Sequence, residues 1–184
     1  MNRTLSTREM ILCALFSALT AASALISIPL PFSPVPVTFQ VFFVLLSGAI
    51  LGSKLGAISQ TVYILSGITG LPVFSRGMGG LVYLLGPTGG YIIGFPVCAY
   101  LTGLLFERIN KPYGKKAIPI FLSGLLAIYV PGVIWLLLVS GLGIVKVILI
   151  GVVPFLPGDI VKIILAYGFI NKYNNLLKVN KGMK

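Results

Sequence analysis

Residues 117–140 read AIPIFLSGLLAIYVPGVIWLLLVS, a run of twenty-four positions without an Asp, Glu, Lys or Arg. A helix rises about 1.5 Å per residue, so roughly 20 apolar residues cross the ~30 Å hydrocarbon core of a bilayer. This stretch is therefore predicted to be a membrane-spanning helix, and it decides the class of the protein.

Apolar stretches of similar length lie on both sides of this segment. The predicted spans cover residues 9–28, 39–53, 55–72, 87–106, 117–140 and 157–171. The second span is short and the third is interrupted by Gly67 and Gly70. Residues 141–156 are apolar without forming a clear span, so we expect either a loop packed into the protein or an extension of the last helix. These patterns predict an all-α integral membrane protein of the cell membrane, with a single multi-pass domain over residues 1–184.

The composition of the whole chain supports this class. Hydrophobic residues make up 57% of the 184 positions and charged residues 9%, whereas a soluble domain carries about 25% charged residues. A cytosolic enzyme, a disordered chain and a secreted disulfide scaffold are therefore excluded. The chain has no His and three acidic residues, so zinc sites and His-based triads lack their usual parts. We expect neither a metal site nor a catalytic site.

The basic residues predict an orientation. If six spans alternate from a cytoplasmic N-terminus, eleven of the fourteen Lys and Arg residues fall on the cytoplasmic side, as the positive-inside rule requires. The eleven are Arg3, Arg8, Lys54, Arg108, Lys111, Lys115, Lys116, Lys172, Lys178, Lys181 and Lys184. Both termini are therefore expected in the cytoplasm. These bases lie at the ends of apolar runs, without interleaved aromatic residues, so we do not expect nucleic-acid binding.

The start of the chain also resembles a signal peptide, since two Arg residues precede an apolar run with Ala22-Ser23-Ala24 as a cleavage-like sequence. However, the apolar run continues through Leu30, and cleavage would leave an odd number of spans. We therefore expect this segment to be retained as the first span.

A proline-rich link and a glycine-rich link interrupt the apolar pattern. Four prolines within residues 29–36 exclude a helix and favour extended chain, and Gln40 places an amide at the start of a span, where it needs a partner. Residues 72–91 are rich in glycine, and irregular backbone at membrane depth is tolerated only when it is buried or lines a cavity. A simple outer loop explains the proline-rich link better when that link is taken alone, and it explains the glycine-rich link equally well.

The third interruption is Pro157-Gly158-Asp159, followed by Lys162. Asp159 is well placed to cap the start of a helix, with Lys162 neutralising it on the same face. Ionisable residues within a span cost about 2.5–3.5 kcal/mol each on insertion scales, so the pair equally suggests a polar interior or a bound ligand.

Small residues at four-residue spacing predict close helix contacts. Ala14, Ala18 and Ala22 form such a stripe, as do Gly48, Gly52 and Gly56, and the partner of each stripe is open. Cys13 and Cys98 lie within apolar runs and are expected to be buried apolar residues. No P-loop is present, because GAILGSK at 48–54 has the wrong spacing, so the chain is not expected to hydrolyse nucleotide by that motif.

At these same positions the chain resembles the BioY family, the biotin-specific S components of energy-coupling factor (ECF) transporters. The resemblance covers about residues 9–170. It rests on four strings in order: SPVPVTFQ at 33–40, GLPVF at 70–74, GPTGGY at 86–91 with Gly94-Phe95, and PFLPGD at 154–159 with Lys162.

The resemblance implies the six-helix S-component bundle and a function without catalysis. Biotin would be captured near the outer face as the transported substrate, without a cofactor. A transmembrane T subunit and two ATPase subunits would drive tipping of the loaded subunit in the membrane. The stripe of Ala14, Ala18 and Ala22 would dock on the T subunit.

The resemblance also suggests the pocket residues. Asp159 would accept from the ureido N–H of biotin, and Lys162 would orient Asp159 or meet a ligand oxygen. Arg76 and nearby glycine amides would take the carboxylate. The other expected members are those that wall the ring or close the pocket: Tyr83, Tyr91, Phe74, Gln40, Thr38 and Gly89.

Three other functions are weighed against this one. An S component for another vitamin would keep the fold and change the pocket. A membrane scaffold protein would use the polar breaks only as helix caps. An intramembrane enzyme is disfavoured, because the sequence offers no His, no pair of acids and no obvious activated nucleophile.

Overall fold

The computed structural model describes residues 5–109 and 114–182, with side chains described as far as Lys172. Arg3, Lys111 and Lys184, and the side chains of Lys178 and Lys181, lie outside this description. The helices are α1 (Thr7–Ala24), α2 (Gln40–Leu51), α3 (Ser53–Ile68), α4 (Leu81–Leu85), α5 (Gly89–Arg108), α6 (Ala117–Ser140), α7 (Ile144–Gly151) and α8 (Leu156–Gly182). Two strands, β1 (Ser27–Leu30) and β2 (Ser33–Thr38), and three short 3₁₀ turns, η1 (Ser75–Gly77), η2 (Gly114–Lys116) and η3 (Val153–Phe155), complete the described elements.

The long helices lie where the apolar stretches predict them. The predicted spans correspond to α1, α2, α3, α5, α6 and α8, and within the described residues three helical segments are long and apolar enough to cross a membrane. These are Gly89–Arg108, Gly114–Ser140 and Ile144–Lys172. The prediction of a mostly helical membrane protein is therefore confirmed.

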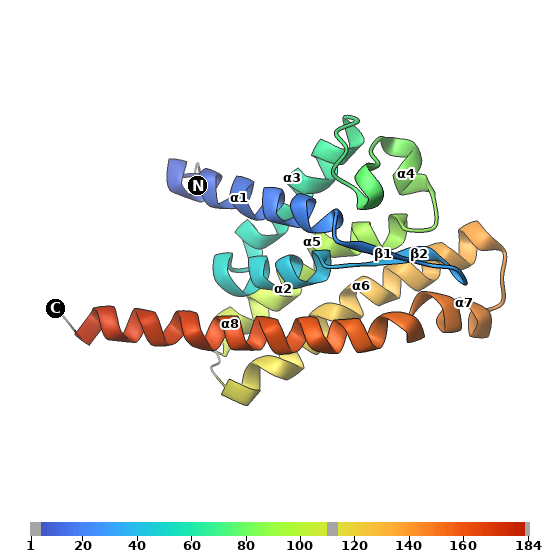
Figure 1. Cartoon of the computed structure of the whole chain (residues 1–184). Helices are drawn as coiled ribbons and strands as arrows, with labels where there is room; N and C mark the ends of the chain where they lie inside the picture. Colours follow the sequence, from blue (N-terminus) through green and yellow to red (C-terminus); the bar gives the residue numbers. More distant parts are fainter. Residues whose placement is uncertain (1–4, 110–113, 183–184) are drawn as a thin grey trace.

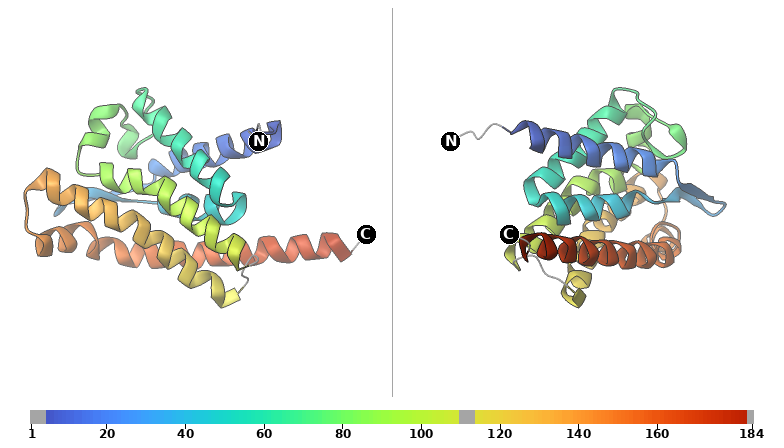
Figure 2. Two further views of the ribbon diagram at one scale, coloured as in Figure 1. Left: turned by 180° about the vertical axis from the view of Figure 1, so that it is seen from behind. Right: turned by 60° about the vertical axis from the view of Figure 1, so that its left-hand side comes forward.

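The helices form one bundle whose two ends carry different elements. The start of α1 and the end of α8 lie together at one end, while the β1–β2 hairpin, α4 and α7 lie at the other (Figures 1 and 2). In this arrangement α5 is central and packs against α2, α3 and α6. The loops that connect the helices at the hairpin end are therefore brought together, although they are distant in sequence.

Glycines allow the central helices to approach closely. A side chain at Gly48 of α2 would meet backbone of α5, and one at Gly94 of α5 would meet Cα of Ile128 on α6 at 2.9 Å. The stripe that includes Gly48 and Gly56 therefore serves internal packing. Cys13 and Cys98 are free and buried, as predicted.

At the hairpin end the structure differs from the sequence-based prediction in two ways. The proline-rich link is extended, as predicted, but it forms an antiparallel pair in which Ser27 faces Thr38 and Ile28 faces Val37. Both strands of a two-stranded ribbon are edges, where prolines without an N–H donor are tolerated. The third apolar stretch is helical only to Ile68, because the chain turns at Gly70 with a φ of +97°.

The region 141–156 is neither simply a packed loop nor simply an extension of the last helix, the two structures expected from the sequence. It contains a separate short helix, α7, and the η3 turn, which leads directly into α8. Because α8 begins at Leu156, Asp159 lies inside the first turn and is not the residue that caps the helix. Capping therefore does not explain why this segment carries an acidic residue.

Candidate ligand-binding site

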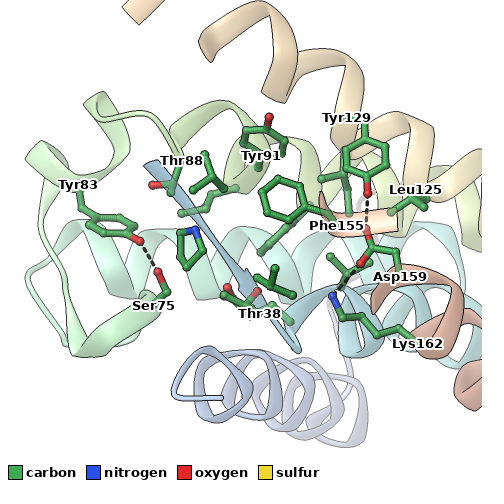
Figure 3. Close-up of a pocket in the computed structure, with 18 residues that line it drawn as sticks. Thr38, Ser75, Tyr83, Thr88, Tyr91, Leu125, Tyr129, Phe155, Asp159 and Lys162 are labelled. Atoms are coloured by element: carbon green, nitrogen blue, oxygen red, sulfur yellow. Dashed lines mark hydrogen bonds and ion pairs between the residues drawn. The ribbon is translucent and has the colours of Figure 1, made fainter. Parts of the chain in front are cut away.

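A cavity of about 60 Å³ lies at the hairpin end of the bundle. Its walls come from β2, η1, α4, α5, α6, η3 and the first turns of α8 (Figure 3). Most of the lining is apolar or aromatic, with a few polar side chains, which is the usual character of a small-molecule site. The cavity thus joins all three stretches that interrupt the apolar pattern of the sequence.

One end of the cavity carries a buried ion pair. Lys162 Nζ donates to Asp159 Oδ1 at 2.7 Å, and the Tyr129 hydroxyl donates to Asp159 Oδ2. Asp159 is 2% exposed and Lys162 5% exposed. The i, i+3 spacing places both charged residues on one face of α8, and Tyr129 reaches them from α6 (Figure 3). Removing either charge would leave the other buried without compensation.

The opposite end of the cavity is built from the glycine-rich link. Ser75 in η1 and Tyr83 in α4 form a hydrogen bond between their hydroxyl groups, and Thr88 lies beside them (Figure 3). The ring of Tyr83 stacks on Phe74, with centroids 5.2 Å apart and planes inclined by 17°. Phe74 itself is 0% exposed and supports Tyr83 from behind, so Tyr83 rather than Phe74 lines the cavity.

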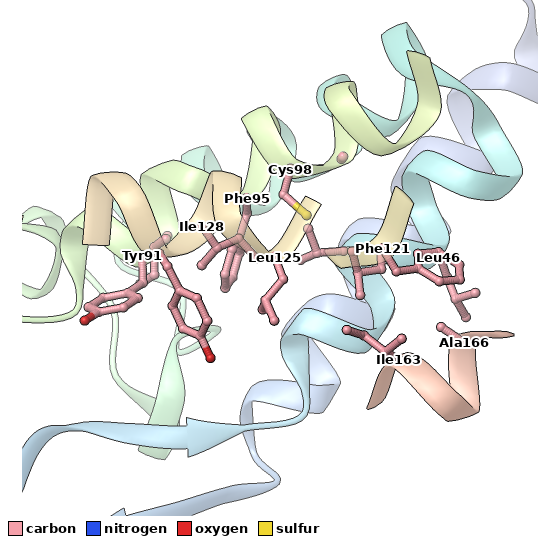
Figure 4. Packing of buried hydrophobic residues seen from close by; sticks show 14 of the residues in the cluster. Leu46, Tyr91, Phe95, Cys98, Phe121, Leu125, Ile128, Ile163 and Ala166 are labelled. Carbon is pink, nitrogen blue, oxygen red and sulfur yellow. The ribbon is translucent and has the colours of Figure 1, made fainter. Parts of the chain in front are cut away.

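Aromatic rings form the wall between the two ends. The Tyr91 hydroxyl donates to the carbonyl of Gly151 at 2.9 Å, which fixes the ring, and Phe155 packs edge-on against it. Phe95, Leu125 and other apolar residues continue the wall into the core between α5, α6 and α8 (Figure 4). The middle of the cavity is therefore suited to an apolar ring.

The first link closes the cavity from the side. Thr38 ends β2 and Gln40 begins α2, and both line the cavity. Gln40 Nε2 donates to the Tyr63 hydroxyl at 2.5 Å, so the amide at the start of this span has the partner that the sequence required. The Gln40 side chain is thereby held in place by α3.

Arg76 lies outside this cavity, in an adjoining hollow of about 390 Å³. The two spaces share four lining residues, Pro36, Ser75, Tyr83 and Thr88. Arg76 is exposed and its backbone has a φ of +61°, the left-handed region that non-glycine residues seldom adopt. An anionic group that extends past Ser75 and Tyr83 would therefore enter the hollow that Arg76 lines.

The structure gathers six of the nine residues predicted for the ligand around this cavity. These are Asp159, Lys162, Tyr83, Tyr91, Gln40 and Thr38. Phe74 supports the wall from behind, and a side chain at Gly89 would collide with Leu84 and Trp135, so Gly89 serves helix packing. Sequence reasoning missed Tyr129, Ser75, Thr88 and Phe155.

Ala14, Ala18 and Ala22 lie on α1 and do not line this cavity. All three are exposed, so the stripe is not used for packing within the chain. Among the described residues, no group of three or more His, Cys, Asp or Glu side chains could hold a metal ion. What the cavity offers chemically is a carboxylate and an ammonium group at one end, aromatic walls, and a route to a guanidinium group.

Comparisons with known proteins place the chain in a family. The family model described as the BioY family matches residues 1–179. A protein of Pyrococcus horikoshii named as a probable biotin transporter BioY is 45% identical over 155 residues, which cover 84% of this chain and 89% of that protein. The biotin transporter BioY of Thermotoga maritima is 42% identical over 163 residues, covering 86% of this chain and 91% of that protein.

A solved structure is also similar. It is a crystal structure of the S-component for biotin from an ECF-type ABC transporter, with a TM-score of 0.85 and 27% sequence identity. The alignment covers 94% of this chain and 95% of that chain. The helical arrangement described above is therefore that of an S component.

Proposed function

This chain belongs to the BioY family, and from that membership we propose that it is the biotin-capturing S component of an ECF-type vitamin transporter. It is a membrane protein and not an enzyme. The observation that carries the proposal is the Asp159–Lys162 pair at the end of an otherwise apolar cavity, in a fold shared with a biotin S component.

The chemistry of biotin matches the two ends of the cavity. Its ureido ring has two N–H donors and a carbonyl, its sulfur-containing ring is apolar, and its tail ends in a carboxylate. A carboxylate has about four acceptor positions, and two of those on Asp159 are used by Tyr129 and Lys162. The others can accept from the ureido N–H groups. Lys162 has further N–H donors for the ureido carbonyl.

The tail then leads toward the second end. If the ureido ring sits at Asp159, the apolar ring lies between Tyr91 and Phe155, and the tail passes Tyr83 and Ser75. Its carboxylate would enter the adjoining hollow and pair with the Arg76 guanidinium, a charge-assisted contact. Gln40 and Thr38 would close the cavity from the side.

We propose six spans with both termini in the cytoplasm. The proposal is supported by helices α1, α2, α3, α5, α6 and α8, which overlap the predicted spans, and by the start of α1 and the end of α8, which lie at the same end of the bundle (Figure 1). The described bases Arg8, Lys54 and Arg108 also lie near that end, in agreement with the positive-inside rule. The cavity end would then face the outside of the cell membrane, where the vitamin arrives.

Delivery would need partners that this chain does not supply. We propose a transmembrane T subunit and two ATPase subunits, which supply the energy for tipping of the loaded subunit. The exposed stripe of Ala14, Ala18 and Ala22 would let a helix of the T subunit approach α1 closely. This stripe lies on a different part of the chain from the cavity, so capture and docking can be tested separately.

The decisive experiment measures biotin binding by the Asp159→Asn variant. Equilibrium dialysis with labelled biotin should show an affinity about 10- to 100-fold lower, because a charge-assisted hydrogen bond contributes about 1.5–3 kcal/mol. Glu107→Gln is the matched control, since it removes a carboxylate that bonds Ser53 away from the cavity. Unchanged biotin affinity in folded Asp159→Asn would reject the pocket assignment.

The same assay separates the alternatives. An S component for another vitamin would leave labelled biotin unbound, and it would bind the other vitamin when that vitamin carries the label. A scaffold protein would bind neither. Tight binding of biotin that is displaced only by unlabelled biotin supports the proposed function against both.

A further inference from the structure

An apolar groove separates the start of α6 from the first half of α8, on a different face of α8 from the proposed biotin-binding cavity. It has a volume of about 250 Å³ and is lined by Ile118 and Leu122 of α6 and by Ile160, Ile163, Ile164 and Tyr167 of α8. None of these residues lines the biotin cavity. The groove forms because α6 packs mainly on α5 and its first turns diverge from α8 (Figure 2).

The groove follows one face of each helix. On α8 its residues lie at positions i, i+3, i+4 and i+7, a continuous stripe along the axis. The next position on that stripe is Asn171, whose Oδ1 accepts from the backbone N–H of Gly114 at 3.0 Å. This hydrogen bond joins α8 to the η2 turn and closes one end of the groove with polar groups.

Three lysines gather at this closed end. Lys115 lies three residues before Ile118 and seven before Leu122, so it continues the α6 side of the groove. Lys116 follows it, and Lys172 follows Asn171 on α8; all three lysines are exposed. None of them has an ion-pair partner in the part of the chain that the structure describes. Glu107, the acid at this end, accepts from Ser53 instead.

A long apolar groove that ends in unpaired cations matches one kind of molecule. We propose that it binds an anionic glycerophospholipid, with an acyl chain along Ile118, Leu122 and Ile164 and the headgroup phosphate at Lys115. Lys116 and Lys172 add positive charge, and the Asn171 amide keeps its N–H groups available as donors. Basic sites between helices at a membrane surface bind acidic headgroups for this reason.

A lipid fits this place better than a protein partner does. The exposed small residues that favour close helix packing lie on α1, whereas the groove is walled by branched and aromatic side chains that keep another helix backbone away. The bound lipid would fill the gap between α6 and α8, and so support the helix that carries Asp159 and Lys162.

Native mass spectrometry of the delipidated full chain tests the proposal. Phosphatidylglycerol and phosphatidylcholine with identical acyl chains are titrated separately. We expect one phosphatidylglycerol to bind at least tenfold more tightly than phosphatidylcholine. Lys115→Ala should reduce this preference at least fivefold, while Lys146→Ala on α7, an exposed lysine at the other end of the bundle, should leave it unchanged.

Variants that fill the groove with a larger side chain provide the second part of the test. Leu122→Trp should lower the occupancy of both lipids, because its side chain is 47% exposed into the groove and a larger ring occupies that space. Ile164→Trp, on the α8 wall of the groove, replaces Leu122→Trp if that variant does not fold. Retained biotin binding shows that a variant is folded. The proposal would be overturned if Lys115→Ala kept the full preference for phosphatidylglycerol, or if the Trp variants still bound one lipid at full occupancy. It would also be overturned if the chain copurified with a protein bound at the groove and with no lipid there.

Discussion

The hydroxyl of Tyr129 donates a hydrogen bond to Oδ2 of Asp159, and this bond joins the middle of α6 to the first turn of α8. Tyr129 is 8% exposed and Asp159 2%. The bond holds the carboxylate in one orientation, while Lys162 holds its other oxygen. The ion pair that we assign to the ureido ring therefore depends on a third residue from another helix.

Replacing Tyr129 with Phe should weaken both stability and binding. Loss of a hydrogen bond to a charged group lowers the free energy of unfolding by about 1.5–3 kcal/mol. Biotin affinity should fall about tenfold, because Asp159 can rotate away from the ligand. Tyr100→Phe is the matched control, since Tyr100 is 46% exposed on α5, outside the cavity. Equal biotin affinity in Tyr129→Phe and the native chain would contradict the orienting role.

The buried ion pair predicts a rescue of stability without a rescue of binding. Asp159→Asn alone leaves the Lys162 ammonium buried without a counter-charge, which costs about 3–5 kcal/mol in the free energy of unfolding. The double variant Asp159→Asn with Lys162→Met removes both charges and should recover most of that loss. Thermal unfolding measures the first quantity and equilibrium dialysis the second.

The double variant should still bind biotin weakly, because both polar partners of the ureido ring are gone. Recovered biotin affinity in the double variant would show that the pair serves folding alone. Failure of the double variant to recover stability would show that the charges are stabilised by something other than each other.

The charged residues of the site could be predicted from sequence, but their partner could not. Asp159 and Lys162 stand out because ionisable residues are costly within an apolar segment, and their spacing places them on one helical face. Tyr129 does not stand out, because a tyrosine in an apolar run can equally face lipid. Only the rotation of α6 against α8 decides which way its hydroxyl points.

The hairpin and the role of Phe74 could not be predicted from the sequence, because both depend on contacts between segments. Prolines argue against a strand in general, and nothing local indicates that β1 and β2 form a two-stranded ribbon in which both are edges. Phe74 and Tyr83 are both aromatic residues of one link, and the η1 turn determines which of the two faces the cavity. The mostly helical character of the chain was predictable, because its signal is composition over many residues.

Close packing of α5 on α6 predicts a large effect of one methyl group. In Gly94→Ala the new Cβ would lie 2.9 Å from Cα of Ile128 and 3.0 Å from the carbonyl oxygen of Ala127. Backbone cannot move aside cheaply, so the free energy of unfolding should fall by about 1–3 kcal/mol. Gly168→Ala on α8 is the control, because its Cβ would meet no atom within 4 Å.

The control variant should be neutral or more stable by about 0.5–1 kcal/mol, since alanine restricts the unfolded chain and favours helix. Thermal unfolding in the same detergent compares the two variants directly. Equal melting temperatures for Gly94→Ala and Gly168→Ala would mean that α5 and α6 are not in close contact at Gly94.

The position of Arg76 predicts a dependence on the charge of the ligand tail. Arg76→Ala should lower the affinity for biotin about tenfold and leave the affinity for biotin methyl ester unchanged, because only the free acid can pair with a guanidinium group. Competition dialysis with both ligands measures the difference. An equal loss for both ligands would show that Arg76 supports the η1 turn rather than the carboxylate.

The exposed stripe on α1 predicts a variant that separates docking from capture. Ala18→Leu places a large side chain in the middle of the stripe, which should prevent a partner helix from approaching and abolish copurification of the proposed T and ATPase subunits. Biotin binding by the isolated subunit should stay unchanged, because no residue of the stripe lines the cavity. Val145→Phe, at a position 69% exposed on α7, adds bulk elsewhere and should leave the complex intact. If Ala18→Leu copurifies with these subunits as well as the native chain does, the docking surface must lie on another face of the bundle.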